Sequence, residues 1–212
     1  KYFLNITGRR DGSSRFGEKN RFGNFGAIGT AWEFYKEKNI QESLSWLSYG
    51  KLRGSYGTTG SDHIGDYLYR DTYSQIRVQS GSLSSGGIIP SKLHNPYYHW
   101  EKNTKLEFAI DLGLWSNRVL LATSWYRERS GNQLIGLSLP SITGFTSIQG
   151  NFPAIVENIG WEFVLQATPI QTSNFIWNSN LNLTVPKNKL IDFPDLESSS
   201  YASQYEIGES LG

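Results

Sequence analysis

The sequence contains no cysteine and no methionine, and its charges almost cancel, with 20 Lys and Arg against 19 Asp and Glu. Without cysteine, disulfide frameworks, thiolate zinc sites and thiol catalysis are excluded. The near-neutral balance leaves no dense basic patch for a phosphate backbone, so we expect no nucleic-acid partner. No run of 18 apolar residues occurs, which excludes a transmembrane helix.

A signal peptide is also absent, and the first residue is Lys1. We therefore expect these 212 residues to be one section of a longer protein, or a processed form. Aromatic residues are abundant, with 7 Trp, 12 Tyr and 11 Phe, although only 38% of residues are hydrophobic. Together with 22 Gly, this composition favours β-structure over helices.

Apolar and polar side chains alternate along seven segments, which is the pattern of a strand with one apolar and one polar face. The clearest segment is 104–114, where Leu106 and Phe108 share one face and Lys105 and Glu107 the other. The other segments are 1–10, 22–34, 51–58, 119–127, 158–167 and 175–185. An eighth strand is expected at 201–209.

Five of these segments have 10–13 residues and the other two have 8 and 9. Strands of soluble sheets have about 5–6 residues and outer-membrane strands about 9–11. The connections 115–118 and 170–174 are short and polar, whereas 11–20, 59–103 and 128–154 are long. Short turns at one end and long loops at the other are typical of transmembrane barrels. We therefore prefer a membrane barrel to a soluble β-sandwich, with a helical turn or two expected within 39–47.

Five tryptophans fall near the ends of the predicted strands, where indoles form the interfacial girdle of membrane barrels. Trp32, Trp115 and Trp177 are placed at the end with the short turns, and Trp100 and Trp125 at the end with the long loops.

The alternation also predicts which side chains meet lipid and which meet the lumen. The lipid-facing set is Leu106, Phe108, Ile110, Leu112, Leu114, Ile159, Phe163, Leu165, Leu181 and Leu183. The lumen-facing set is Lys105, Glu107, Asp111, Glu162, Gln166, Asn178, Asn180 and Asn182. We expect Arg to cost about 2–4 kcal/mol at Ile110 and much less at Ala109.

Catalytic and metal-binding patterns are weak. The Ser-Asp-His run at 61–63 is adjacent in sequence, whereas catalytic triads are assembled in space. All three His lie in the loop 59–103, and His94 and His99 have no carboxylate at ligand spacing except Glu101. We therefore predict no catalytic residue, no metal, no cofactor and no enzymatic activity.

Several short motifs occur in an order that resembles the barrel of SusC/RagA-like TonB-linked outer-membrane proteins. Each motif alone is weak, but together they span nearly the whole chain. They are RDGSSRFG (10–17), KLRGSYGTTG (51–60), NP with WE (95–96, 100–101), NR with WY (117–118, 125–126), PSITGF (140–145), NIGWEF (158–163) and Asn188.

This resemblance implies an all-β, antiparallel, up-and-down transmembrane β-barrel segment, with about seven to eight strands of a larger, roughly 22-stranded barrel. Residues 1–212 would be part of the barrel domain, with the plug domain and TonB box absent from them. It also implies import of glycans or peptides across the outer membrane of a Gram-negative bacterium. The implied partners are outer-membrane lipid, TonB, the protein's own plug domain, a SusD-like lipoprotein and an oligosaccharide or peptide ligand. The lumen-facing residues would contact the plug domain or line the path of the solute, and the alternative for any one of them is a hydrated wall residue without a specific role.

In such a protein, extracellular loops help to hold the ligand, and aromatic rings can stack on sugars while Arg or His hydrogen-bonds to polar groups. The candidates are Tyr67, Tyr69, Arg70, Tyr73, Tyr97, Tyr98 and His99. Packing of these loops on one another, or on the lipoprotein, is the alternative. Two other classes remain open: a glycan-binding adhesin or lectin-like β-protein without transport, and an outer-membrane enzyme barrel.

Overall fold

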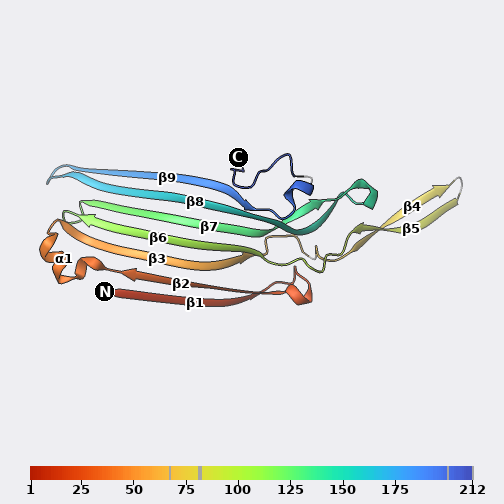
Figure 1. Ribbon diagram of the computed structural model, residues 1–212, viewed down its shortest axis with the longest axis horizontal. Helices are drawn as coiled ribbons and strands as arrows, with labels where there is room; N and C mark the ends of the chain where they lie inside the picture. Colours follow the sequence, from red (N-terminus) through yellow and green to blue (C-terminus); the bar gives the residue numbers. More distant parts are fainter. Residues whose placement is uncertain (67, 81–82, 200, 212) are drawn as a thin grey trace.

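The computed structural model describes residues 1–66, 68–80, 83–199 and 201–211. Seven strands form one antiparallel sheet in the order β1-β2-β3-β6-β7-β8-β9 (Figure 1). Their bounds are β1 Tyr2–Gly12, β2 Phe22–Trp32, β3 Leu47–Ser61, β6 Glu101–Leu114, β7 Val119–Ser138, β8 Ser147–Gln171 and β9 Ile176–Asp192. Neighbours in the sheet follow one another along the chain, apart from a hairpin between β3 and β6, so the expected up-and-down β-topology is confirmed.

One end of the sheet carries the short turns 115–118 and 172–175, together with the longer connection 33–46. Trp115, Ser116 and Asn117 join β6 to β7 with φ angles of 50°, 57° and 62°, a left-handed conformation that Asn adopts more readily than most residues. The expected helical turn is present as α1 (Lys38–Ser43), preceded by the 3-10 turn η2 (Phe34–Lys36), between β2 and β3. The first residue of β1 lies at this same end (Figure 1).

The opposite end carries the long connections, and the segment 59–103 is more regular than expected. β3 continues to Ser61, β6 begins at Glu101, and β4 (Thr72–Ser80) pairs with β5 (Leu83–Lys92) as a separate two-stranded sheet. This ribbon projects beyond the main sheet (Figure 1). Within the described residues β4 and β5 pair with each other and with no other strand. Such a ribbon needs no apolar face, and period-two alternation did not reveal it.

The segment 128–154, expected as a loop, is also mostly strand. β7 continues to Ser138 and β8 starts at Ser147, which leaves a short connection with the 3-10 turn η3 (Ser141–Thr143). Asn132 has a φ of 57°, and the register between β7 and β8 shifts between Gly131 and Gln133. A bulge of this kind inverts the alternation of side chains. The pattern had already ended at residue 127, because Arg127 and Arg129 stand at positions of the apolar face.

The eighth strand expected at 201–209 is not formed, and that prediction is wrong. Tyr201 and Tyr205 lie four residues apart on one turn, where the Tyr205 N–H donates to the Tyr201 carbonyl at 3.2 Å. Both rings pack against a buried cluster, and this turn brings them to it without a strand partner. That cluster is made of Ala154, Val156, Leu190, Phe193 and Leu196, next to the 3-10 turn η4 (Leu196–Ser198).

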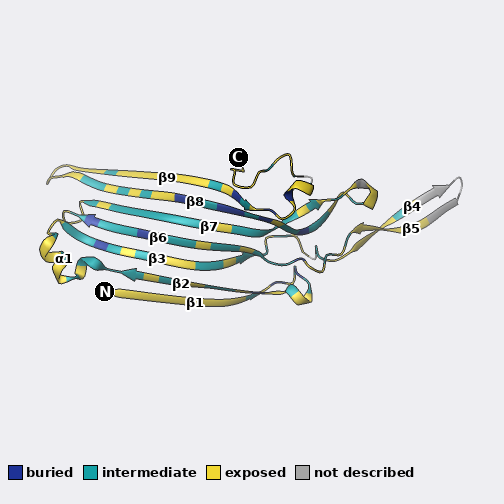
Figure 2. Cartoon of the chain, viewed as in Figure 1, coloured by how far each residue is buried: buried dark blue, intermediate teal, exposed yellow. Residues whose placement is uncertain are grey.

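Burial is low over most of the sheet. β1 is almost entirely exposed and β9 mostly so, while the central strands are half-buried (Figure 2). The buried residues gather mainly at the long-loop end, which also holds the remaining 3-10 turn η1 (Glu18–Asn20). Within the described residues the sheet therefore has no second layer, and neither of its faces is covered by another part of the chain.

Candidate functional site

The hydrogen-bonded register separates the side chains of the sheet into one apolar and one polar face. Phe108 pairs with Gly54 on β3 and Trp125 on β7, and Trp125 pairs in turn with Trp161 on β8. Paired residues share a face, so this row and its neighbours form a continuous apolar surface across the strands. The residues predicted to face lipid all lie on this apolar face.

The opposite face collects the residues predicted to face the lumen. Glu107 pairs with Ser55 and Tyr126, Asp111 with Lys51 and Ala122, and Gln166 with Leu120 and Asn180. Lys105, Glu162 and Asn182 alternate with them on the same side. Asn178, whose side-chain oxygen accepts a 2.8 Å hydrogen bond from Thr168, lines a small hollow of about 270 Å³ together with Gln166 and Asn180.

Arg53, which the sequence did not single out as a site residue, organises the charged part of the polar face. Its Nε and one terminal nitrogen donate to the two oxygens of Asp111 at 2.9 and 3.2 Å. Its other terminal nitrogen lies 3.6 Å from Glu107, which also pairs with Lys105 at 2.9 Å. Such two-point Arg–carboxylate geometry fixes orientation as well as charge. The sequence signal for this role was that Lys51, Arg53 and Ser55 occupy every second position of one strand and therefore share its polar face.

We expect the Arg53–Asp111 pair to be measurably coupled. In a double-mutant cycle with Arg53→Gln and Asp111→Asn, the coupling energy should be about 0.5–1 kcal/mol, because both groups are partly exposed and the geometry is two-pointed. Chemical unfolding of the full-length protein measures it, with Asn182→Asp as an unrelated polar-face control. Additive single effects would contradict the pair.

At the long-loop end, two of the family-like motifs pack on each other. Phe16, from RDGSSRFG, is fully buried against Tyr98 and Trp100, with ring centroids at 5.8 and 5.2 Å. Asn20 donates to the carbonyls of Pro96 and Tyr98 at 3.2 and 3.1 Å. The motifs at 10–17 and 95–101 therefore connect two loops by packing and hydrogen bonds. We call this contact between Phe16, Asn20 and residues 96–100 the joint.

Other side chains extend this joint. Asn151 on β8 accepts the His99 N–H at 3.0 Å and donates to the His99 carbonyl at 2.7 Å. Asn95 donates to the Gln149 carbonyl at 2.7 Å. Arg15 donates to Asp66 at 2.9 Å, and this hydrogen bond raises the pKa of the Arg15 guanidinium. The loops that follow β1 and β3, and the segment before β6, are thus held over the end of the sheet.

Tyr98 lies at the centre of the joint and is only 1% exposed. Its hydroxyl has no hydrogen-bond partner among the described residues. Burial raises the pKa of the phenol further above neutral pH. An unsatisfied buried hydroxyl destabilises the fold. The contribution of Tyr98 to the stability of the joint therefore comes from its ring and not from its hydroxyl.

Tyr98→Phe is therefore expected to leave the joint intact and to raise its stability by up to about 1 kcal/mol, because it removes a buried unpaired group. Thermal unfolding of the full-length protein measures this. Tyr97→Phe is the matched control, since Tyr97 is 82% exposed, and should change nothing. A marked loss with Tyr98→Phe would show that the hydroxyl has a binding partner in solution.

The residues predicted to contact ligand are divided between exposed and buried positions. Tyr97 and Tyr73 are exposed, and the Tyr73 hydroxyl donates to Asp71 at 3.0 Å. Arg70 donates to the Tyr69 hydroxyl at 3.1 Å. The Tyr69 carbonyl accepts the Asn95 N–H at 3.0 Å, which brings these two loops together. The His99 ring lies 2.7 Å from the Tyr97 carbonyl.

One of these predictions changes with the structure, and another falls on a residue that the structure does not describe. Tyr98 offers no open ring face, because it packs beneath the loops, so its assignment as a ligand contact is corrected to a structural one. Tyr67 lies outside the described residues. Tyr69, Arg70, Tyr73, Tyr97 and His99 remain predicted ligand contacts.

The tryptophans follow the predicted ends with one exception. Trp32 ends β2, Trp115 lies in the β6–β7 turn and Trp177 follows the start of β9, all at the short-turn end. Trp100 precedes β6 at the opposite end, where its indole donates to the Arg21 carbonyl at 3.3 Å. Trp125 was placed near a strand end, but β7 continues to Ser138, so Trp125 lies well inside the strand.

Within the described ranges, no three His, Cys, Asp or Glu side chains come together as a metal site. None of the helices in that part of the chain is long and apolar enough to cross a membrane.

No family model matches the chain. It is 35% identical over 215 residues to a protein of Formosa agariphila named "TonB-dependent receptor P39", covering 100% of this chain and 20% of that protein. It is 30% identical over 218 residues to "TonB-dependent receptor SusC" of Bacteroides thetaiotaomicron, covering 100% of this chain and 21% of SusC. The chain thus spans about a fifth of the length of these relatives.

The fold is also similar to solved structures of the RagAB transporter. A chain of the RagAB peptide transporter superposes with a TM-score of 0.82 at 29% identity, covering 92% of this chain and 21% of the other. The RagAB peptide importer in its 'closed-closed' state gives a TM-score of 0.83 with the same coverage and identity. The seven-stranded sheet therefore corresponds to part of a RagAB chain.

Proposed function

Because the chain is homologous over its full length to TonB-dependent receptors that include SusC, we propose that it forms neighbouring strands of an outer-membrane nutrient importer. The single observation that supports this best is the division of β3, β6, β8 and β9 into one apolar and one polar face. A barrel wall needs one face for lipid and one for an aqueous interior. Residues 1–212 are proposed to belong entirely to the barrel domain, with the plug domain and TonB-interacting segment lying elsewhere in the full-length protein.

In this proposal the apolar face meets the lipid of a Gram-negative outer membrane. The polar face, with the network of Arg53, Asp111, Glu107 and Lys105, lines the interior. The long-loop end is extracellular, and its joint of Phe16 and Tyr98 fixes the loops that carry Tyr69, Tyr97 and His99. A fixed base of this kind lets exposed aromatic and polar groups meet a ligand at a lower entropic cost.

The substrate class that these loops suit is an oligosaccharide or a peptide. Exposed tyrosine rings can stack on sugar faces, and Arg70 or His99 can hydrogen-bond to hydroxyls or peptide carbonyls. We propose that a SusD-like lipoprotein covers this end and that TonB energises import. RagAB, to which this chain is similar, is a peptide transporter, which supports testing peptides alongside glycans.

Uptake by the source bacterium tests this proposal. A strain lacking the full-length gene should lose uptake of at least one class in a panel of fluorescent oligosaccharides and peptides, and a strain without working TonB should lose the same class. Tyr97→Ala in the full-length protein should weaken this uptake more than Phe175→Ala, an exposed residue in the opposite turn. Unchanged uptake of every compound in the deletion strain would contradict import.

A further inference from the structure

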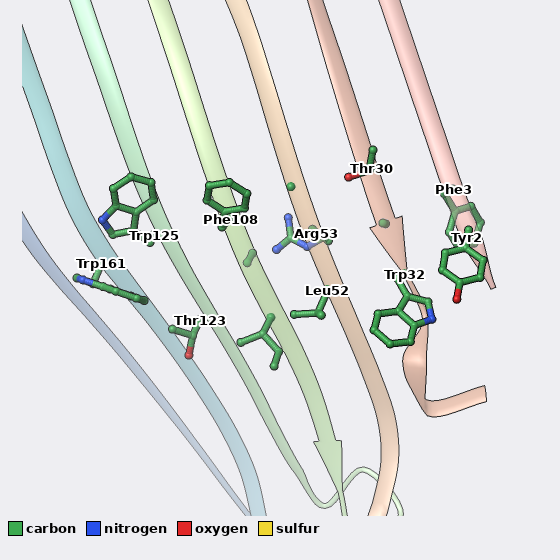
Figure 3. A pocket seen from close by; sticks show the side chains of 14 residues that line it. Tyr2, Phe3, Thr30, Trp32, Leu52, Arg53, Phe108, Thr123, Trp125 and Trp161 are labelled. Carbon is green, nitrogen blue, oxygen red and sulfur yellow. The ribbon is translucent and has the colours of Figure 1, made fainter. Parts of the chain in front are cut away.

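The apolar face contains a hollow near the short-turn end of the sheet (Figure 3). Its volume is about 690 Å³, within the range of about 300–1,000 Å³ found for small-molecule sites. One wall is the stacked pair of Tyr2 and Trp32, whose ring centroids lie 5.9 Å apart. The other wall is the row of Phe108, Trp125 and Trp161 on β6, β7 and β8.

The floor of the hollow lies where large side chains are missing from an otherwise bulky face. Gly54 and Thr30 form one rung with Phe108, while Leu52 and Tyr56 flank Gly54 on the same face of β3. A Cβ at Gly54 would lie 3.4 Å from the Phe108 ring and 3.7 Å from the Thr30 hydroxyl, which are ordinary contacts. Neither crowding nor a left-handed backbone therefore requires glycine here, although glycine weakens a strand interior.

The chemistry of the hollow excludes a charged occupant. Its lining is mainly aromatic and aliphatic, and Thr30 and Thr123 are its neutral polar side chains. The one charged residue of the lining, Arg53, is held on the opposite face by Asp111 and Glu107. The hollow is also local, with 14 lining residues, whereas a stable protein interface uses about 20–30 residues on each side. A flexible, apolar and narrow molecule fits these limits.

We propose that this hollow binds one acyl chain of a bilayer phospholipid, held between the Tyr2–Trp32 stack and the Phe108–Trp125–Trp161 row. Trp32 ends β2 at the short-turn end, so the bound lipid belongs to the leaflet on that side. The inference rests on the proposed function, because the apolar face must lie against lipid for the chain to enter.

Photo-crosslinking tests the site in the full-length protein, reconstituted in vesicles with a trace of phosphatidylethanolamine that carries a diazirine in its acyl chain. Crosslinks located residue by residue should concentrate at Leu52, Phe108 and Trp125, several-fold above Leu181 and Leu183 on the same face. Gly54→Leu fills the floor and should reduce the excess to the level of Leu181 and Leu183. Gly8→Leu is the matched control, because Gly8 lies on the apolar face with open space around it and outside the hollow.

The outcomes separate the two proposals. Equal labelling of the hollow and of Leu181 and Leu183 in the wild-type protein would overturn the acyl-chain site while leaving the lipid-facing assignment in place. Labelling of Asn180 and Asn182 in preference to Leu181 and Leu183 would overturn the proposed function itself. The wild-type distribution decides the question even if Gly54→Leu does not fold, and Gly54→Ala, whose Cβ fits, then supplies a partial filling of the floor.

Discussion

Leu183→Arg in β9 is expected to lower the free energy of unfolding in a phospholipid bilayer by about 2–4 kcal/mol, because it places a charge in the apolar band. Asn182→Arg, one residue away on the opposite face, should cost much less. Leu183 is 52% exposed and Asn182 is also exposed, so neither substitution removes much packing within the described residues. The difference between them therefore reports the medium that each face meets.

Denaturant unfolding of the full-length protein in vesicles measures this difference. Leu183 pairs with Phe163 and Asn182 with Val164, so the two variants sample the same region of the β8–β9 pairing. Our sequence-based comparison of Ile110 with Ala109 is less suitable, because Ala109 is 6% exposed and pairs with Arg53, where a second Arg would meet a like charge. Equal costs at Leu183 and Asn182 would contradict a sheet with lipid on one side only.

Phe16→Ala is expected to destabilise the joint at the long-loop end by about 3–5 kcal/mol, the usual cost of removing a buried aromatic ring. Phe16 is fully buried and contacts the rings of Tyr98 and Trp100. The loop 13–21 is held to the segment before β6 by this ring and by Asn20. Losing the ring should free both loops while the sheet stays paired.

Hydrogen exchange of the full-length protein distinguishes local from global loss. Amides in 13–21 and 93–100 should exchange faster in Phe16→Ala, whereas those of β6 and β7 should keep their protection. Phe175→Ala is the matched control, since Phe175 is 57% exposed in the turn between β8 and β9. Unchanged exchange in both loops would mean that the joint does not depend on the Phe16 ring.

Alternation along the chain was sufficient to predict the main sheet. Each of the seven segments overlaps one strand of the main sheet, and the apolar and polar sets of β6, β8 and β9 lie on opposite faces as expected. This succeeds because a side chain's face depends only on the parity of its position within a strand. The prediction lost the outer part of β7 after residue 127, because Arg127 and Arg129 occupy positions of the apolar face and end the alternation before the bulge at Asn132.

The loops were predicted least well, because their contacts join residues far apart in sequence. Phe16 lies 82 positions before Tyr98, and Asn151 follows His99 by 52. Nothing in either segment alone shows that Tyr98 is buried while its neighbour Tyr97 is exposed. The motif residues were recognisable, but their packing role required both loops in space.

The sequence by itself determined the fold class, the two faces of the strands and the ends to which the short and long connections belong. Local side-chain period and turn composition are sufficient for these features. Only the tertiary structure decided the pairing of Arg53 with Asp111, the burial of Tyr98 and the hollow above Gly54. Each of these depends on the register between strands or loops distant in sequence, and a shift of one residue in that register would move every side chain to the other face.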